Sequence, residues 1–594
     1  MKKVICLSLA IMLLLSLALT GCGKASDPQV SGDNKTTEGQ DTAIQTGSTE
    51  ADTSQSWFHK YEEEVVLTRN ARIIADAKYA EGDDAENNPY TRWAKNEIGI
   101  VYKQKWSVPD GATDIQKLNL AMASNDLPDI ISLSAGDLLS KMIQANILTP
   151  INKLIDEYGS PLTKYMINSY QESLDGNFFA LFTKKDDYYA FPEAADVFGA
   201  NYNGLWIRKD VLDTLGKQVP ETLEQFEDIL AAYKESNPEG IGFVYNSIPI
   251  MNAHGAFPKK WVKDDDGSLI YGSIRPEVKE ALATLNKWYK NGWLDKEYFV
   301  KDFTKSMEPF LAGNGLAVYG QWWYPSWPLP DVWKNVPTAE IVPVQPLKGT
   351  SGKQAIMYDM KNGYFDSGIA INAKCKNPEA LVYMLNEHLD SQYRHDKDLR
   401  DKMKKEYNYD FKYPYETVKT PTNPDAPLEE QKWDYQKEGP GYFNIYHGNP
   451  VHHFFGFKFN QAPAEMYNTI MVANNAYKNN TVEALKDEDI VSYQWIKSWD
   501  TNNKGLESIF KLIDLYNFLK DQPELFVYNQ FTSSSTITMV DKGAYLDKLE
   551  SETFAKIIIG EKPIDEFEKF VEEWKKAGGN EVTNEVNEWY QANK

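Results

Sequence analysis

The sequence predicts an α/β fold with mainly parallel sheets, arranged as two lobes that each have a hydrophobic core. Short apolar runs typical of buried strands recur along the chain, at residues 65–67, 130–133, 205–207, 316–319 and 368–371. Segments with helical apolar periodicity separate them, and this alternation favours parallel strand pairing through helical crossovers. The chain has 594 residues, which is long enough for two cores.

Helices are predicted where apolar residues recur at intervals of three and four. Residues 113–123 place Ile115 and Leu118 on one face. Another helix is expected to begin after Thr222, whose side chain can cap it, and Gln225 completes a capping box.

The C-terminus is also predicted to be helical. Pro563 opens a segment that places Phe567, Phe570 and Trp574 on one side, and Gly578 follows its last turn. We therefore expect Trp574 to be a core residue.

Residues 1–21 have the pattern of a secretory signal. A positively charged start precedes residues 4–19, which are almost wholly apolar but too short for a stable membrane-spanning helix. They end on Leu19-Thr20-Gly21-Cys22, which looks like the site where bacterial lipoproteins are cleaved and lipidated. We expect Cys22 to carry a lipid that anchors the chain to the outer face of the cell membrane. The alternative is an ordinary signal peptide with an incidental cysteine.

Residues 22–56 are predicted to form a disordered tether. They are dominated by Ser, Thr, Gln, Gly and Asp and contain no aromatic residue, so they cannot bury enough apolar surface to fold.

The formal net charge of the whole chain is -23, which argues against nucleic acid and anionic membrane surfaces as partners. Apart from Cys22 and the cysteine of the signal, only Cys375 remains, so no intramolecular disulfide is expected.

No catalytic motif is present in the sequence. It lacks a Gly-x-Ser-x-Gly elbow, a Walker A sequence and a His-Glu-x-x-His pair. His452 and His453 are adjacent but lack a nearby ligand cluster, and residues 500–505 lack the glutamate that would close a calcium loop. Residues 264–267 are expected to form a hairpin turn. We therefore expect no enzyme activity, metal or cofactor.

Several segments resemble the extracellular solute-binding protein family 1. They are residues 126–131 (DLPDII), 205–212 (LWIRKDVL), 310–322 (FLAGNGLAVYGQW), 367–372 (SGIAIN) and 558–567 (IIGEKPIDEF). The segment at residues 558–567 resembles the large oligosaccharide-binding lipoproteins that serve ABC importers. No single motif is decisive, but their order and spacing are specific, and together they cover the chain from about residue 57 to its end. Residues 400–460 fit the family pattern poorly.

The resemblance implies a type II periplasmic-binding-protein-like fold with a ligand cleft between two lobes. It further implies a monomer that binds an oligosaccharide and contacts the permease subunits of an ABC transporter. The expected lobes are residues 57–205 with 344–465, and residues 206–343 with 466–594.

The resemblance also suggests which residues contact the ligand. Aromatic rings stack on the apolar faces of sugars, and polar side chains bind their hydroxyl groups. Trp322 is implied to stack on a sugar, whereas Trp323 is equally compatible with the core. Asp137 is either a ligand residue or a helix cap. The other candidates, for which loop or turn roles remain open, are Tyr202, Asn203, Asp83 and Asn88.

Three functions remain open at this point. The first is capture of an oligosaccharide for import, which the absence of a nucleophile motif favours. The second is hydrolysis of a polysaccharide by a surface lipoprotein, and the third is binding of a non-sugar ligand on the same fold. Arg208 is compatible with binding an acidic sugar, although a structural ion pair is favoured.

Overall fold

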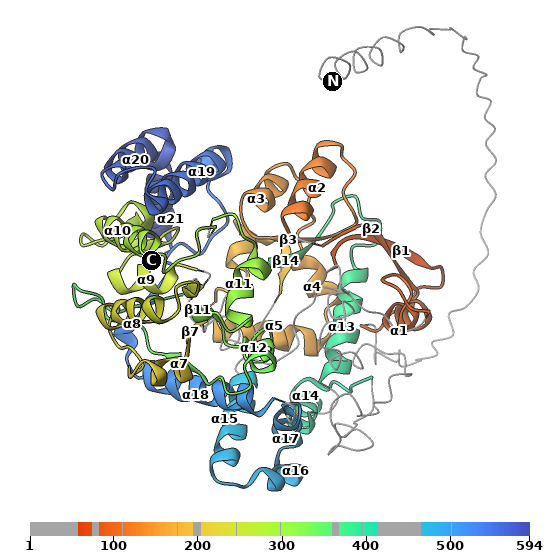
Figure 1. Ribbon diagram of the computed structural model, residues 1–594. Coiled ribbons are helices and arrows are strands. Elements are labelled where there is room, and N and C mark those ends of the chain that lie inside the picture. The colour runs from red at the N-terminus through yellow and green to blue at the C-terminus, as the bar shows by residue number, and fades with distance from the viewer. Residues whose placement is uncertain are drawn as a thin grey trace, which may run out of the picture. The chain divides into compact units, whose positions relative to one another are not determined.

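The computed structural model describes residues 57–73, 82–193, 203–358, 367–412 and 465–593, apart from isolated positions within these ranges. Contacts divide the chain into two units, residues 1–54 and residues 55–594. All the elements discussed below belong to the second unit, in which strands and helices alternate (Figure 1). This alternation confirms the predicted α/β class.

The first sheet contains β1 (Val65–Arg72), β2 (Ile100–Val108), β3 (Ile130–Ser134), β6 (Ala190–Pro192) and β14 (Ser367–Ile371). Its strand order is β2–β1–β3–β14–β6. β1 pairs in parallel with β2 and β3, whereas β14 pairs antiparallel with β3 and β6.

Both faces of the first sheet are buried. Ile369 and Ile371 of β14 contribute to the core on one face, and Ala370 between them contributes to the core on the other. Such two-sided burial explains why the central strands β3 and β14 are mostly apolar. The helices that supply these cores include α1 (Pro89–Trp93), α2 (Gly111–Ala123), α3 (Asp137–Gln144), α5 (Pro161–Ser173) and α13 (Ala380–Gln392).

The second sheet contains β7 (Asn203–Arg208), β8 (Ile241–Val244), β11 (Gly315–Gln321) and β12 (Ile341–Val344). Its order is β12–β7–β11–β8. β11 pairs in parallel with β8, and β7 pairs antiparallel with both β11 and β12.

The second sheet is likewise buried on both faces. Leu205 and Ile207 point to one core and Trp206 to the other. The first core includes residues of α8 (Leu223–Ser236), α9 (Ile248–His254), α10 (Pro276–Lys290), α19 (Ile537–Ile559), α20 (Glu566–Trp574) and α21 (Asn580–Ala592). The second core includes residues of α11 (Phe303–Leu311), α12 (Pro330–Asn335), α15 (Glu465–Lys478), α17 (Ile490–Lys497) and α18 (Asn503–Lys520).

The prediction of mainly parallel sheets is confirmed, because all strands of each sheet but one run in the same direction. Strands joined by helical crossovers are parallel, as β1, β2 and β3 show, since parallel pairing requires such a connection. β7 instead follows the first sheet along the chain and β14 follows the second. Each of these two strands enters its sheet in the opposite direction to its neighbours.

Local predictions of caps and turns were confirmed. The Thr222 side chain accepts from the Gln225 amide, and the Gln225 side chain caps the Thr222 backbone in return. Residues 264–267 turn between the antiparallel strands β9 (Trp261–Lys263) and β10 (Leu269–Tyr271). The helix predicted from Pro563 begins at Glu566, and Trp574 is 2% exposed, as expected of a core residue.

None of the helices in the described ranges has an apolar stretch of the length that crossing a bilayer requires.

Candidate functional site

Several strand ends of the second sheet meet at one edge. The carboxyl ends of β8, β11 and β12 share this edge with the start of the antiparallel strand β7. Ligands of α/β proteins bind beyond the carboxyl ends of such strands. A cavity of about 30 Å³ lies at this edge, with Asn203, Asn252, Tyr319 and Gln345 in its wall. It has room for a water molecule or a single hydroxyl group but not for a sugar ring.

The cavity contains a buried hydrogen-bond acceptor. Asn203 is the first residue of β7, and its Oδ1 is buried with no hydrogen-bond donor among the described residues. Tyr319 lies on the neighbouring strand, where burial raises the pKa of its hydroxyl and the Asn203 side chain partly offsets this rise. An unpaired buried acceptor costs about 1–3 kcal/mol. Asn203 is therefore suited to accept a hydrogen bond from a ligand hydroxyl.

Sequence reasoning selected Asn203 but missed Asn252 and Tyr319. Tyr319 belongs to an apolar run that was interpreted only as a strand. One signal was available in the sequence. Neighbouring residues of a strand face opposite sides of its sheet, and Tyr319 and Val318 accordingly belong to different cores. Asn252 lies on α9, and no pattern in its own segment links it to β7.

The loop after β11 carries Trp322 and Trp323, both half-buried against the core that contains Trp206. Trp323 stacks on Trp327, with ring centroids 5.9 Å apart and planes at 26°. Tyr324 is buried, and Gly320 leaves room for its ring, since a Cβ at Gly320 would lie 1.8 Å from a ring carbon. The loop is therefore packed in place, with Trp322 and Trp323 still partly accessible.

Asp137 is the first residue of α3 and is half-buried. Burial raises the pKa of its carboxyl group, while a hydrogen bond with the Ser535 side chain and the charge of Lys141 oppose the rise. Its Oδ2 would lie 3.0 Å from a Cβ built on Gly543 of α19. Asp137 thus faces a helix that supplies the core of the second sheet.

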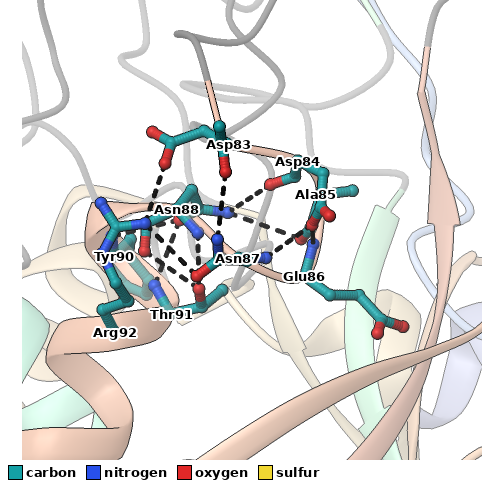
Figure 2. Close-up of polar contacts among 10 residues, drawn as sticks. Asp83, Asp84, Ala85, Glu86, Asn87, Asn88, Tyr90, Thr91 and Arg92 are labelled. Atoms are coloured by element: carbon teal, nitrogen blue, oxygen red, sulfur yellow. Dashed lines mark hydrogen bonds and ion pairs between the residues drawn. The ribbon is translucent and has the colours of Figure 1, made fainter.

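Asp83 and Asn88 belong to a hydrogen-bonded turn before α1 (Figure 2). The Asn88 Oδ1 accepts from the Tyr90 and Thr91 amides at 3.1 Å each, as a helix cap does. Arg92 Nη1 donates to Asp83 Oδ1 at 2.8 Å. These contacts are those of a turn and a helix start, and a ligand role for either residue stays a prediction.

The remaining sequence candidates are placed as follows. Tyr202 and Cys22 lie outside the described residues, as do most of residues 400–460. Arg208 is 3% exposed and forms a bidentate ion pair with Asp210, at 2.8 and 2.6 Å. This pair confirms the structural role favoured for Arg208.

The family model for bacterial extracellular solute-binding proteins matches residues 77–386, which is more than half of the chain. The chain belongs to this family. The match spans every strand of the first sheet except β1, the whole of the second sheet and the site at its edge. The resemblance inferred from sequence motifs is thereby confirmed.

Individual relatives are distant. The fructooligosaccharide ABC transporter substrate-binding protein FusA of Streptococcus pneumoniae is 25% identical over 303 residues, covering 47% of this chain and 53% of FusA. This chain therefore matches about half the length of that relative. The lipoprotein LipO of Bacillus subtilis is 23% identical over 542 residues, covering 86% of this chain and 90% of LipO.

Solved structures share the fold. The crystal structure of the alginate-binding protein AlgQ2 superposes with a TM-score of 0.61 at 18% sequence identity, covering 90% of this chain and 99% of AlgQ2. The fold is thus the two-lobed, type II periplasmic-binding-protein-like fold that the motifs implied.

Proposed function

We propose that this chain captures an oligosaccharide in a cleft between two lobes and delivers it to the permease of an ABC importer. The observation that carries the proposal is the edge of the second sheet, where the buried Asn203 acceptor lies near the loop of Trp322 and Trp323. Such a site suits a sugar, because aromatic rings stack on its apolar faces and polar side chains bind its hydroxyl groups. The carbohydrate ligands in the names of FusA and AlgQ2 support the same reading.

In this proposal each sheet forms the centre of one lobe. The predicted lobes are residues 57–205 with 344–465 and residues 206–343 with 466–594. We assign residues up to Tyr358 to the second lobe, because Ile356 and Tyr358 pack in its core. The protein acts as a monomer in this account.

The site proposal is tested by Trp322→Ala. An indole that stacks on a sugar contributes about 1–2 kcal/mol by burial of C–H surface, so its loss should weaken the affinity roughly tenfold. The measurement is titration calorimetry with a panel of neutral and acidic oligosaccharides, first on the parent chain and then on the variant.

Thermal melts accompany that titration, because Trp322 also packs against a core. A variant with unchanged affinity and a lower melting temperature would show that Trp322 is only a core residue. A parent chain that binds no oligosaccharide in the panel would argue for a non-sugar ligand instead.

The anchor is a separate part of the proposal. We propose that a lipid on Cys22 holds the protein at the outer face of the cell membrane. Cys22→Ser should then release the protein into the medium, and fractionation of cells expressing each form measures this release. A variant that stays with the membrane fraction would rule out Cys22 as the anchor.

We also propose that the chain has no catalytic role, in keeping with its relatives, which are binding proteins. Release of reducing ends from a polysaccharide by the purified chain would contradict this part of the proposal.

A further inference from the structure

Gly543 occupies an unusual place for a glycine. It lies in the interior of α19, a helix of 23 residues. Glycine in a helix interior costs about 1 kcal/mol relative to alanine. The structure shows what the missing side chain allows, because a Cβ at Gly543 would lie 3.0 Å from Asp137 Oδ2 and 3.7 Å from Oδ1. The carboxylate of Asp137 fills the space that a side chain would need.

This contact joins elements of different sheets. α3 packs through Leu139 and Met142 against the first sheet, and α19 packs through Leu546 and Phe554 against the second. Figure 1 shows α3 and α19 side by side, and the two helices are in contact. The Asp137–Gly543 contact therefore connects the two lobes through space.

A second contact lies close by in the sequence. The Ser534 hydroxyl, just before α19, donates to the Thr183 carbonyl at 3.2 Å. Thr183 begins the short strand β4 (Thr183–Lys184), directly after Phe182, which is part of a core of the first sheet. Residues 534–543 thus contact the first lobe at two separate points.

We propose that Asp137 and Gly543 form a latch that stabilises the closed arrangement of the two lobes, with Ser534 and Thr183 as its second point. The proposal rests on the proposed function, since the latch would act on ligand capture. A contact made only in the closed form raises the population of that form and so strengthens ligand binding. Asp137 is then a positioning residue and does not touch the sugar.

The test variant is Gly543→Leu. Leucine is a good helix former, so α19 itself should not be weakened, but its side chain cannot occupy the space of the Asp137 carboxylate. We expect a larger radius of gyration by small-angle scattering without any sugar present. For a sugar that binds, we expect an affinity at least about fivefold weaker, through faster dissociation.

Two further variants make the result specific. Ala544→Leu adds the same side chain to the next, exposed position of α19 and should change neither quantity. Asp137→Ala added to Gly543→Leu removes the clash and should restore at least part of the affinity. If Gly543→Leu does not fold, Gly543→Ala should show the same effects at smaller size.

The possible outcomes separate the latch from the proposed function. An unchanged radius of gyration and affinity in folded Gly543→Leu would overturn the latch. So would a further loss of affinity on adding Asp137→Ala, which would make Asp137 a ligand residue. If the parent chain binds no sugar but Gly543→Leu still enlarges the radius, the proposed function fails and the latch stands.

Discussion

Trp574→Ala is expected to lower the free energy of unfolding by about 3–5 kcal/mol. Trp574 is 2% exposed and stacks on Tyr271, with ring centroids 4.8 Å apart and planes at 6°. The indole is also tightly packed against Gly579, because a Cβ at Gly579 would lie 2.1 Å from it. Little can move into the space left by the ring, so a cavity should remain.

Denaturant unfolding of both forms measures the loss, and calorimetry at a temperature where the variant is folded measures its affinity. We expect the affinity to hold, since Trp574 lies in the core formed with α10 and α19 and is not among the residues that line the candidate site. Together with Trp322→Ala, this variant separates effects on stability from effects on binding. An unfolding free energy equal to that of the parent would show that the core is assigned wrongly.

Glu550→Gln is expected to change the free energy of unfolding, relative to the parent, in a way that depends on pH. The variant should gain up to about 3 kcal/mol more over the parent at pH 8 than at pH 4.5. Glu550 lies on α19, is 2% exposed and accepts a hydrogen bond from the Tyr271 hydroxyl at 3.0 Å. Burial raises the pKa of its carboxyl group from 4.5 to about 7, while Lys259, Ser273 and Tyr271 partly oppose the rise.

The direction of the pH effect follows from proton binding. Below pH 4.5 both the folded and the unfolded forms hold the proton of Glu550, so its contribution to stability is fully present. Between pH 4.5 and about 7 the unfolded form releases this proton while the folded form keeps it. The stability contributed by Glu550 is therefore lost as the pH rises through about 7.

The measurement is the difference in unfolding free energy between the parent and Glu550→Gln from pH 4.5 to pH 8. Taking this difference removes the effect of His254, which is present in both forms. The pKa of His254 is lowered mainly by burial, so its contribution to stability rises with pH in part of this window. A difference that stays constant over the range would mean that Glu550 ionises normally in the folded protein.

The sequence predicted features whose causes lie within a few residues. The cap at Thr222 and the turn at residues 264–267 are of this kind, since each depends on neighbouring side chains and backbone. The apolar runs of β3 and β14 likewise indicated strands buried on both faces. The alternation of such runs with helices was sufficient for the fold class.

Features that depend on distant pairings were not predictable. The direction of β14 depends on how the chain enters the first sheet from the second, and no local pattern encodes it. Asn203 meets Gln321 across β7 and β11, so the members of the candidate site are brought together only by the fold. The contact between Gly543 and Asp137 is likewise created only by the fold, since the two residues are far apart in the sequence.

The central claim is that an oligosaccharide binds between two lobes and closes them. The most direct measurement is small-angle X-ray scattering of the chain carrying Cys22→Ser, with and without a saturating oligosaccharide identified by calorimetry. A ligand that contacts both lobes favours the closed form by its differential affinity, so the radius of gyration should fall on binding. A radius of gyration that is unchanged at saturation would contradict capture by closure of the two lobes.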